Sequence, residues 1–362
     1  MTIDQKIILM PKIDLHRHLE GSIRPKTIYA MSKQSNKNYK LSQLKKNMHA
    51  EKDDNTLMKF LKKLGTPYML ECCTNKGVLT RFSYEAFEDA AKDNISYLEL
   101  RFCPSNYYKT KTTAEEFIEG VYEGSKKAEH DFDIKTAIII SIKREESNKI
   151  NSEIVKLALK YHKLGKINGV DLCGDEPNYP TRNYKDIFDI FYKNNIPITI
   201  HSGESRRVKD IDNVISAINH LHSRRIGHAS IALKSQKTLD LIKQKSILIE
   251  SCPTSSVQTG TVDPDSDIPT SKFKDYKLKL SINTDDPVTS DITLSQEYLT
   301  LINNYKFTIQ DLIRTNFDSI EYAFLPQKVK VKLKKNYNRK IKHWAQKNLS
   351  QEEKDLLRKY LL

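Results

Sequence analysis

The sequence predicts an α/β fold of the (β/α)₈ barrel class, with a helical insertion after the first strand and extra helices at the C-terminal end. Eight short runs of β-branched and apolar residues recur along the chain, and segments with helical periodicity separate most of them. Alternation of strand and helix implies parallel strands that are joined by crossover connections. Eight such units in a chain of 362 residues indicate a barrel.

The elements follow in order along the chain. The predicted strands are residues 12–17, 96–102, 134–142, 169–173, 196–201, 224–228, 246–252 and 278–284. From the second strand onward, the predicted intervening helices are residues 113–131, 151–164, 184–193, 208–220 and 234–243.

The interval between the first and second strands breaks this rhythm. It contains an insertion of about residues 25–92, in which we expect helices over 55–64 and 77–92. An insertion at this point lies on the C-terminal face of a barrel, where it can cover a pocket.

The segment after the eighth strand, about residues 294–362, predicts packing helices over 294–305 and 308–323 and a basic terminal helix. Ser350 and Glu353 have the spacing of a capping box at the start of the last helix. We expect residues 1–362 to form one barrel domain, because no linker, low-complexity block or internal repeat divides them.

Composition excludes several classes of protein. The five cysteines are odd in number and lack a CxxC spacing, which is typical of a reduced, cytoplasmic protein. The apolar stretch 7–10 is too short for a signal peptide, and the run 137–142 is too short to span a membrane. We therefore expect no membrane partner.

The net charge of +14 invites a nucleic-acid interpretation. However, lysines far outnumber arginines and are spread along the chain, whereas base and phosphate recognition favours arginine. The densest block, 328–342, has the character of a solvated helix face, and we expect no nucleic-acid partner. A basic nucleic-acid-binding protein on a retired enzyme scaffold is the competing hypothesis, and it would require a damaged site.

His16 and His18 lie two residues apart at the end of the first predicted strand. Residues i and i+2 of a strand point to the same side, so the two imidazoles can form half of a metal site. Taken alone, a His-x-His pair is more often two histidines on a surface strand than a metal site.

Other polar residues follow the later strands. His201 and Glu204 end the fifth strand, His228 ends the sixth, and Asp285 and Asp286 follow the eighth. In a barrel these strand ends converge on one mouth.

Three histidines and a carboxylate suit a borderline metal such as zinc, which lowers the pKa of a bound water to about 7. A carboxyl group such as Glu204 can stay protonated in an apolar pocket beside such a cluster, although it could also be an exposed glutamate at a helix N-terminus. His228 offers a base. Asp285 and Asp286 are adjacent, so one can ligate while the other contacts substrate, and their spacing leaves the choice open.

The chain resembles the adenosine deaminase family of the amidohydrolase superfamily over nearly its whole length. The motifs that carry the resemblance are LHRHLEGSIRP, YLELRF, GVDLCGDE, HSGE, RIGHA, ESCPTSSVQTG and SINTDDP, in that order. The resemblance implies a barrel with one catalytic zinc and hydrolysis of a 6-aminopurine nucleoside to its 6-oxo product and ammonia. Relatives with two metals use a lysine after the fourth strand, where this chain reads DLCGD.

Carried onto matching positions, the resemblance makes His16, His18, His201 and Asp285 the zinc ligands, with His18 also at the substrate. Glu204 becomes the proton donor to purine N1, and His228 orients or deprotonates the attacking water. The resemblance also assigns purine N7 to Asp286 and purine N3 to the backbone amide of Gly174.

Leu57, Phe60, Leu61 and Leu64 have helical spacing in the insertion and resemble the apolar wall over the family's pocket. The same stripe could be the core-facing side of the helix.

Glu20 departs from the family pattern, because adenosine deaminases usually carry aspartate there, against the ribose 5′-hydroxyl. Family members that act on adenine or on other 6-aminopurine nucleosides often have glutamate. The GDE and CPTSSVQTG motifs are similar to those of the nucleoside enzymes. We expect adenosine and 2′-deoxyadenosine as substrates in purine salvage, with adenine or another 6-aminopurine nucleoside as the alternative. The oligomeric state stays open.

Overall fold

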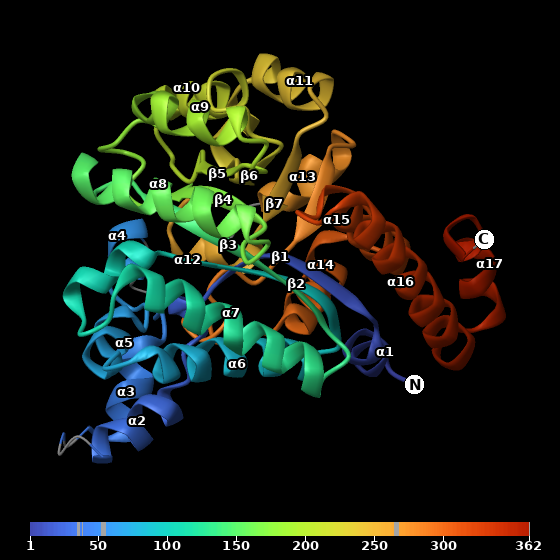
Figure 1. Cartoon of the computed structure of the whole chain (residues 1–362). Coiled ribbons are helices and arrows are strands. Elements are labelled where there is room, and N and C mark those ends of the chain that lie inside the picture. Colours follow the sequence, from blue (N-terminus) through green and yellow to red (C-terminus); the bar gives the residue numbers. More distant parts are fainter. Residues whose placement is uncertain (35–36, 38, 52–55, 264–267, 362) are drawn as a thin grey trace.

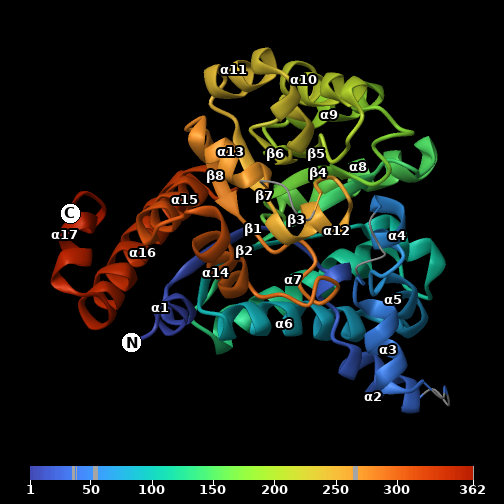
Figure 2. The same cartoon turned by 180° about the vertical axis from the view of Figure 1, so that it is seen from behind.

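A computed structural model describes residues 1–34, 37, 39–51, 56–263 and 268–361 of the chain. Eight parallel strands form its centre (Figures 1 and 2): β1 Lys12–His18, β2 Ile95–Phe102, β3 Lys135–Lys143, β4 Gly169–Cys173, β5 Thr199–Ser202, β6 Arg225–His228, β7 Leu248–Ser251 and β8 Lys279–Ile282. All eight predicted strands are present, and those of the second half are the shorter ones.

The strands pair as two four-stranded sheets, in the orders β1-β2-β3-β4 and β5-β6-β7-β8. Two isolated bridges close the ring. Val170 bridges to Ile198 at one seam, and Arg17 bridges to Asp285 at the other. At the second seam the Asp285 carbonyl accepts from the His18 amide at 2.8 Å. The predicted barrel class is confirmed, and its closing seam passes through the residues that follow β8.

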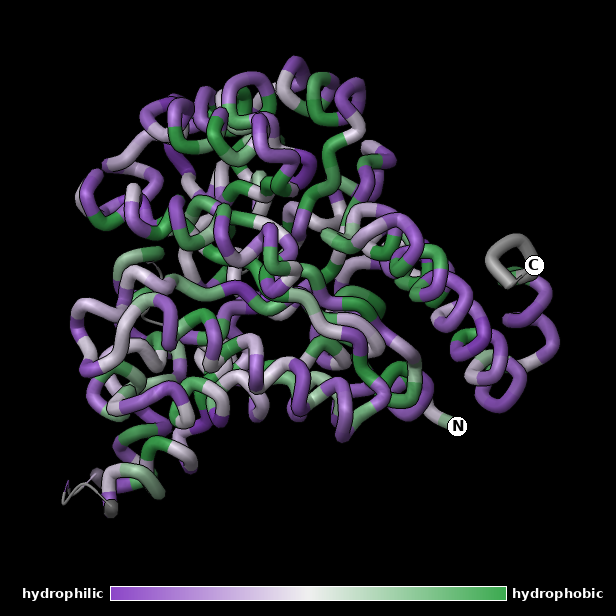
Figure 3. The backbone as a smooth tube through the Cα atoms, in the orientation of Figure 1, coloured by the Kyte–Doolittle hydropathy of each residue, from purple (hydrophilic) through white to green (hydrophobic). Residues whose placement is uncertain are grey.

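Helices cover the outside of the barrel (Figure 1). After β2 the five predicted helices appear in the predicted order, and two further helices, which were not predicted, lie between β7 and β8. Their bounds are α7 Ala114–Asp131, α8 Asn148–Lys163, α9 Lys185–Lys193, α10 Ile211–Asn219, α11 Gln236–Gln244, α12 Pro253–Gln258 and α13 Pro269–Asp275. The tube coloured by hydropathy shows apolar segments concentrated inside and hydrophilic ones on the outer helices (Figure 3). The strand residues are almost all buried, so the barrel interior is a packed core.

The insertion between β1 and β2 contains more helices than the sequence predicts. They are α2 Pro25–Gln34, α3 Leu41–Met48, α4 Leu57–Leu61, α5 Thr66–Cys72 and α6 Lys76–Lys92. The predicted helix over 55–64 is wrong in length: Asn55 lies outside the described residues, and α4 spans only 57–61. The Thr56 side chain caps it by accepting from the Lys59 amide.

The C-terminal part forms α14 Leu294–Tyr305, α15 Ile309–Tyr322, α16 Gln327–Asn348 and α17 Gln351–Leu361, and α1 Ile3–Leu9 lies near them (Figure 2). The Trp344 indole donates to the Lys6 carbonyl at 2.9 Å, which fastens α16 to α1. The predicted capping box is confirmed, since Ser350 and Glu353 each accept from the other's amide, at 3.2 and 2.7 Å. Among the described residues, no helix has the length and apolar character that crossing a membrane requires.

Candidate active site

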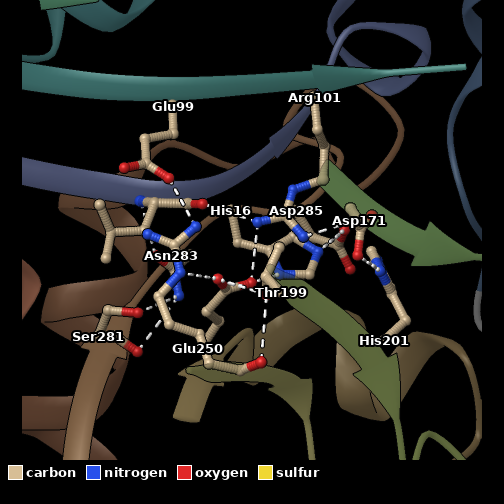
Figure 4. A network of polar contacts seen from close by, with 12 residues as sticks. His16, Glu99, Arg101, Asp171, Thr199, His201, Glu250, Ser281, Asn283 and Asp285 are labelled. Carbon is tan, nitrogen blue, oxygen red and sulfur yellow. Dashed lines mark hydrogen bonds and ion pairs between the residues drawn. The ribbon is translucent and has the colours of Figure 1, made fainter. Parts of the chain in front are cut away.

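The C-terminal ends of β1, β5 and β6 and the residues after β8 bring a group of imidazoles and one carboxylate together. Figure 4 shows His16, His201 and Asp285 of this group. One ligand atom from each of His16, His201, His228 and Asp285 lies within 4.8 Å of the others, and all four residues are buried. His18 joins this cluster, because its Nε2 atom lies 3.3 Å from His16 Nε2 and 3.1 Å from His201 Nε2.

Asp285 lies at the centre of the cluster. Its Oδ1 atom is 3.2 Å from His16 Nε2 and 3.4 Å from His18 Nε2, whereas its Oδ2 atom is 3.8 Å from His228 Nε2. Asp285 has a positive φ of 61°, and His228 has one of 65°. These residues therefore adopt the left-handed conformation that a non-glycine residue rarely takes and that is often found at functional sites.

The outer ring nitrogens show that the cluster suits a metal ion. His16 Nδ1 is hydrogen bonded to Glu250 at 2.8 Å, and His201 Nδ1 to Asp171 at 3.0 Å. Each carboxylate fixes the tautomer with the proton on Nδ1, so the Nε2 lone pairs face one another across the cluster. Lone pairs that converge in this way need a shared cation, and nitrogen and carboxylate donors suit zinc or a similar ion.

The pKa values of the clustered histidines also favour a bound cation. Burial and Arg101 lower the pKa of His16, but Asp285 and Glu250 outweigh them and raise it to about 9. Burial also lowers the pKa of His18 and of His201, which therefore stay neutral. The site thus favours a positive charge near its centre, which a bound cation satisfies.

Beneath the cluster lies a network of buried charges that the sequence interpretation missed (Figure 4). Glu250 on β7 forms ion pairs with Arg101 at 2.8 Å and Arg225 at 2.7 Å, and it accepts from the Thr199 hydroxyl at 2.9 Å. Burial raises the pKa of Glu250, but the two arginines hold it well below its usual range. The sequence feature that could have revealed this network is a charged residue within an apolar strand. Such residues occur in the motifs YLELRF, GVDLCGDE and ESCPTSSVQTG.

Glu204 lies beside the cluster, with its Oε2 atom 3.7 Å from His228 Nε2. The Glu176 carboxylate holds the backbone here, accepting from the amides of Gly203 at 2.9 Å and Glu204 at 3.2 Å. Burial, with a further contribution from Asp285, raises the pKa of Glu204 to about 8. Its side chain is only 9% exposed, so it is not an exposed helix-terminal glutamate.

Asp286 is buried, and its pKa is shifted in the opposite direction from that of the adjacent Asp285. Burial and the adjacent Asp285 raise its pKa well above the usual range, and its Oδ1 atom has no hydrogen-bond partner among the described residues. For Asp285, burial acts in the same direction, but His16 and the other imidazoles hold the pKa well below its usual value. Gly21 makes room for Asp286, since a Cβ there would lie 1.9 Å from Asp286 Oδ1.

A cavity of about 460 Å³ opens over the cluster, within the usual size range of small-molecule sites. The side chains of the predicted apolar stripe line it: Leu57, Phe60, Leu61 and Leu64. None of the four belongs to the barrel's main core cluster, so the geometry favours a pocket wall over a core-facing stripe.

Glu20 and Gly174 line the same cavity. Glu20 Oε1 accepts from the Cys103 amide at 2.9 Å and the Asn106 side chain at 3.2 Å, while its Oε2 atom has no partner among the described residues. Gly174 has a φ of 101°, and a Cβ there would lie 2.3 Å from the Glu145 carboxylate. Both the backbone conformation and the space therefore favour glycine.

The chain is similar to known proteins over most of its length. The family model described as "Adenosine deaminase" matches residues 11–340. An adenosine deaminase of Clostridium acetobutylicum is 31% identical over 92% of this chain and 99% of its own length. One from Clostridium botulinum is 34% identical over 90% of this chain and 98% of its own.

Two solved structures share the fold. An amidohydrolase from "Burkhoderia ambifaria", with bound Zn, has a TM-score of 0.84 at 21% identity and covers 96% of this chain and 95% of its own. An adenine deaminase from Arthrobacter aurescens has a TM-score of 0.82 at 19% identity and covers 93% of this chain and 99% of its own.

Proposed function

The chain belongs to the adenosine deaminase family, whose members are hydrolytic deaminases, and we propose that it converts adenosine and 2′-deoxyadenosine to the 6-oxo nucleosides and ammonia with one zinc ion. The observation that carries the proposal is the approach of His18 Nε2 to His16 Nε2 at 3.3 Å and to His201 Nε2 at 3.1 Å, beside the Glu204 carboxyl group with its raised pKa.

In this proposal His16, His18, His201 and Asp285 hold the zinc. When bound, the ion lowers the pKa of a coordinated water to about 7 and so supplies a nucleophile at neutral pH. The assignment leaves His228 outside the ligand set. Its Nε2 atom is 3.8 Å from Asp285, farther than those of His16 and His18, and it faces Glu204 as well.

His228 and Glu204 move the protons. Burial lowers the pKa of His228 to about 4, so the imidazole is neutral at pH 7 and can accept a proton from the attacking water. Glu204 is protonated over much of the neutral range and can donate to purine N1 as the water adds to the carbon that carries the amine.

The remaining groups position the purine. A protonated Asp286 can donate to N7, and the amide of Gly174 can donate to N3. Leu57, Phe60 and Leu61 cover the ring and exclude water from it. With the reacting carbon at the metal, the sugar extends toward Glu20.

Glu20 is the basis for an alternative substrate. Its side chain is one methylene longer than the aspartate that is usual in the family, so its carboxyl group reaches farther into the cavity. Adenine, or another 6-aminopurine nucleoside, is the competing substrate on the same machinery. The proposal places the enzyme in the reducing cytoplasm, which the free state of its five cysteines supports.

A substrate panel tests the proposal. Zinc-loaded protein is given adenosine, 2′-deoxyadenosine and adenine separately, and deamination is followed by the fall in ultraviolet absorbance and by ammonia release. We expect the two nucleosides to give at least tenfold higher kcat/KM than adenine. Faster turnover of adenine would overturn the substrate assignment, and no turnover of any of the three would overturn the proposed reaction.

A further inference from the structure

Lys143 is a charged residue that the proposed reaction does not use. It is the last residue of β3, and its side chain lines the cavity over the ligand cluster. Across the strands it is paired with Cys173 at the end of β4. Cys103, directly after β2, lies beside them, with its Sγ atom 3.5 Å from Cys173 Sγ.

This group lines the end of the cavity that β2, β3 and β4 form. The clustered imidazoles and Asp285 come from β1, β5, β6 and the segment after β8, whereas β2, β3 and β4 contribute none of them. Glu20, which the proposal places at the sugar, accepts from the Cys103 amide and so lies at the same end. A purine whose amino carbon faces the metal therefore directs its sugar substituents toward Lys143.

Lys143 has no fixed counter-charge. Among the residues that the structure describes, no carboxylate oxygen lies within 4.0 Å of its Nζ atom, and no hydrogen bond is formed by it. Glu20 is engaged by Cys103 and Asn106, and Glu145 accepts from the Asp175 amide.

The Lys143 side chain is protonated at neutral pH even though it is half-buried. Burial lowers the pKa of Lys143, but Cys103 and Glu145 outweigh it and raise the pKa above its usual value. Two more lysines, Lys62 and Lys109, line the same cavity from exposed positions.

We propose that Lys143 is a specificity-determining residue that binds an anionic substituent on the sugar of the substrate, so that the enzyme accepts 6-aminopurine nucleosides carrying a 5′-phosphate. The inference rests on the proposed deamination and adds its substrate class. A neutral nucleoside leaves the Lys143 ammonium without a partner in a half-buried pocket, whereas a phosphate oxygen supplies a charge-assisted hydrogen bond there.

The contact is made equally in the ground state and the transition state, because it lies far from the reacting carbon. Its loss should therefore raise KM for the phosphorylated substrate more than it lowers kcat.

The test compares adenosine 5′-monophosphate with adenosine in zinc-loaded wild type, in Lys143→Gln and in Lys135→Gln. Lys135 is a matched control on the same strand, at the opposite end of the barrel, where it pairs with Glu129 at 2.7 Å. We expect wild type to deaminate the monophosphate, and the ratio of kcat/KM for monophosphate over adenosine to fall at least tenfold in Lys143→Gln, mainly through KM. The ratio should not change in Lys135→Gln.

The other outcomes separate a failure of this inference from a failure of the proposed function. Turnover of adenosine but not of the monophosphate would overturn this inference and leave the proposed function standing. If kcat/KM fell equally for both substrates in Lys143→Gln, so that their ratio did not change, the inference would also be overturned. Lys143 would then only balance the negative charges of Glu20 and Glu145. No turnover of either substrate by zinc-loaded wild type would overturn the proposed function itself.

Discussion

At the scale of single residues, Glu204 shows how burial sets a chemical role. Its carboxyl group lies 3.7 Å from His228, and burial beside Asp285 raises its pKa to about 8. A carboxylic acid that stays protonated near neutral pH can donate a proton, which an ionised carboxylate cannot.

Replacing Glu204 with glutamine therefore keeps the side chain's size but removes its transferable proton. We expect kcat to fall about 10² to 10⁴-fold, the usual contribution of a general acid, while zinc content stays at that of wild type. Steady-state kinetics and metal analysis on the same sample check this. Near-normal turnover would refute the role of Glu204 as proton donor.

Asp285 and Asp286 are adjacent but have opposite environments. Imidazoles surround Asp285 and favour its ionised form, whereas burial favours the protonated form of Asp286. We expect Asp285→Ala to lose nearly all bound zinc. Asp286→Ala should keep its zinc and raise KM about tenfold or more, since one buried hydrogen bond is lost. Metal content and KM of both variants, measured together, would show the reverse pattern if the two roles were exchanged.

At the scale of elements, β7 supports the site without touching the cavity. Its Glu250 forms ion pairs with Arg101 on β2 and Arg225 on β6 and a hydrogen bond with His16 on β1. The buried carboxylate therefore links β7 to three other strands. Removing one member of such a network leaves the others buried without compensation.

Glu250→Gln should therefore lower both stability and metal affinity. We expect a loss of about 3 kcal/mol in the free energy of unfolding and a 10 to 100-fold weaker zinc affinity. Glu321→Gln is the control, because the Glu321 side chain forms an exposed ion pair with Lys279 at 3.4 Å. Its loss should change stability by less than about 1 kcal/mol. Denaturant unfolding and zinc titration measure the two effects. Equal stability of the two variants would contradict the role assigned to the network.

The strands could be predicted from the sequence because each is an apolar, β-branched run between helical segments, as in residues 134–142. The short helices of the insertion could not, since a helix as short as α4 owes its stability to tertiary packing and not to its own sequence. The position of the candidate site followed from polar residues at strand ends. Glu250 and Asp171 were missed because their partners lie on strands that are distant in sequence.

At the scale of the whole molecule, the buried charges couple folding to pH. Glu297 on α14 is fully buried, and one of its oxygens accepts from the Thr254 amide at 3.1 Å. Burial raises its pKa to about 8 from 4.5. Between these values the folded protein binds a proton that the unfolded chain has released, so stability falls as pH rises.

We expect the stability of wild type relative to Glu297→Gln to decrease between pH 4.5 and 8 by about 1.4 kcal/mol per pH unit, and to change little above pH 8. Glutamine keeps the oxygen that accepts from Thr254 but does not titrate. Denaturant midpoints of both proteins at several pH values give the difference. A difference that is constant over this range would contradict a raised pKa for Glu297.

We propose that one zinc ion, held where the barrel closes, makes the chain an adenosine deaminase. The most direct measurement strips the protein with a chelator and follows adenosine deamination while zinc is added back in steps. We expect no activity in the stripped protein and a linear return of activity that saturates at about one zinc per chain. Full activity in the stripped protein, or stoichiometric zinc binding with no deamination, would contradict it.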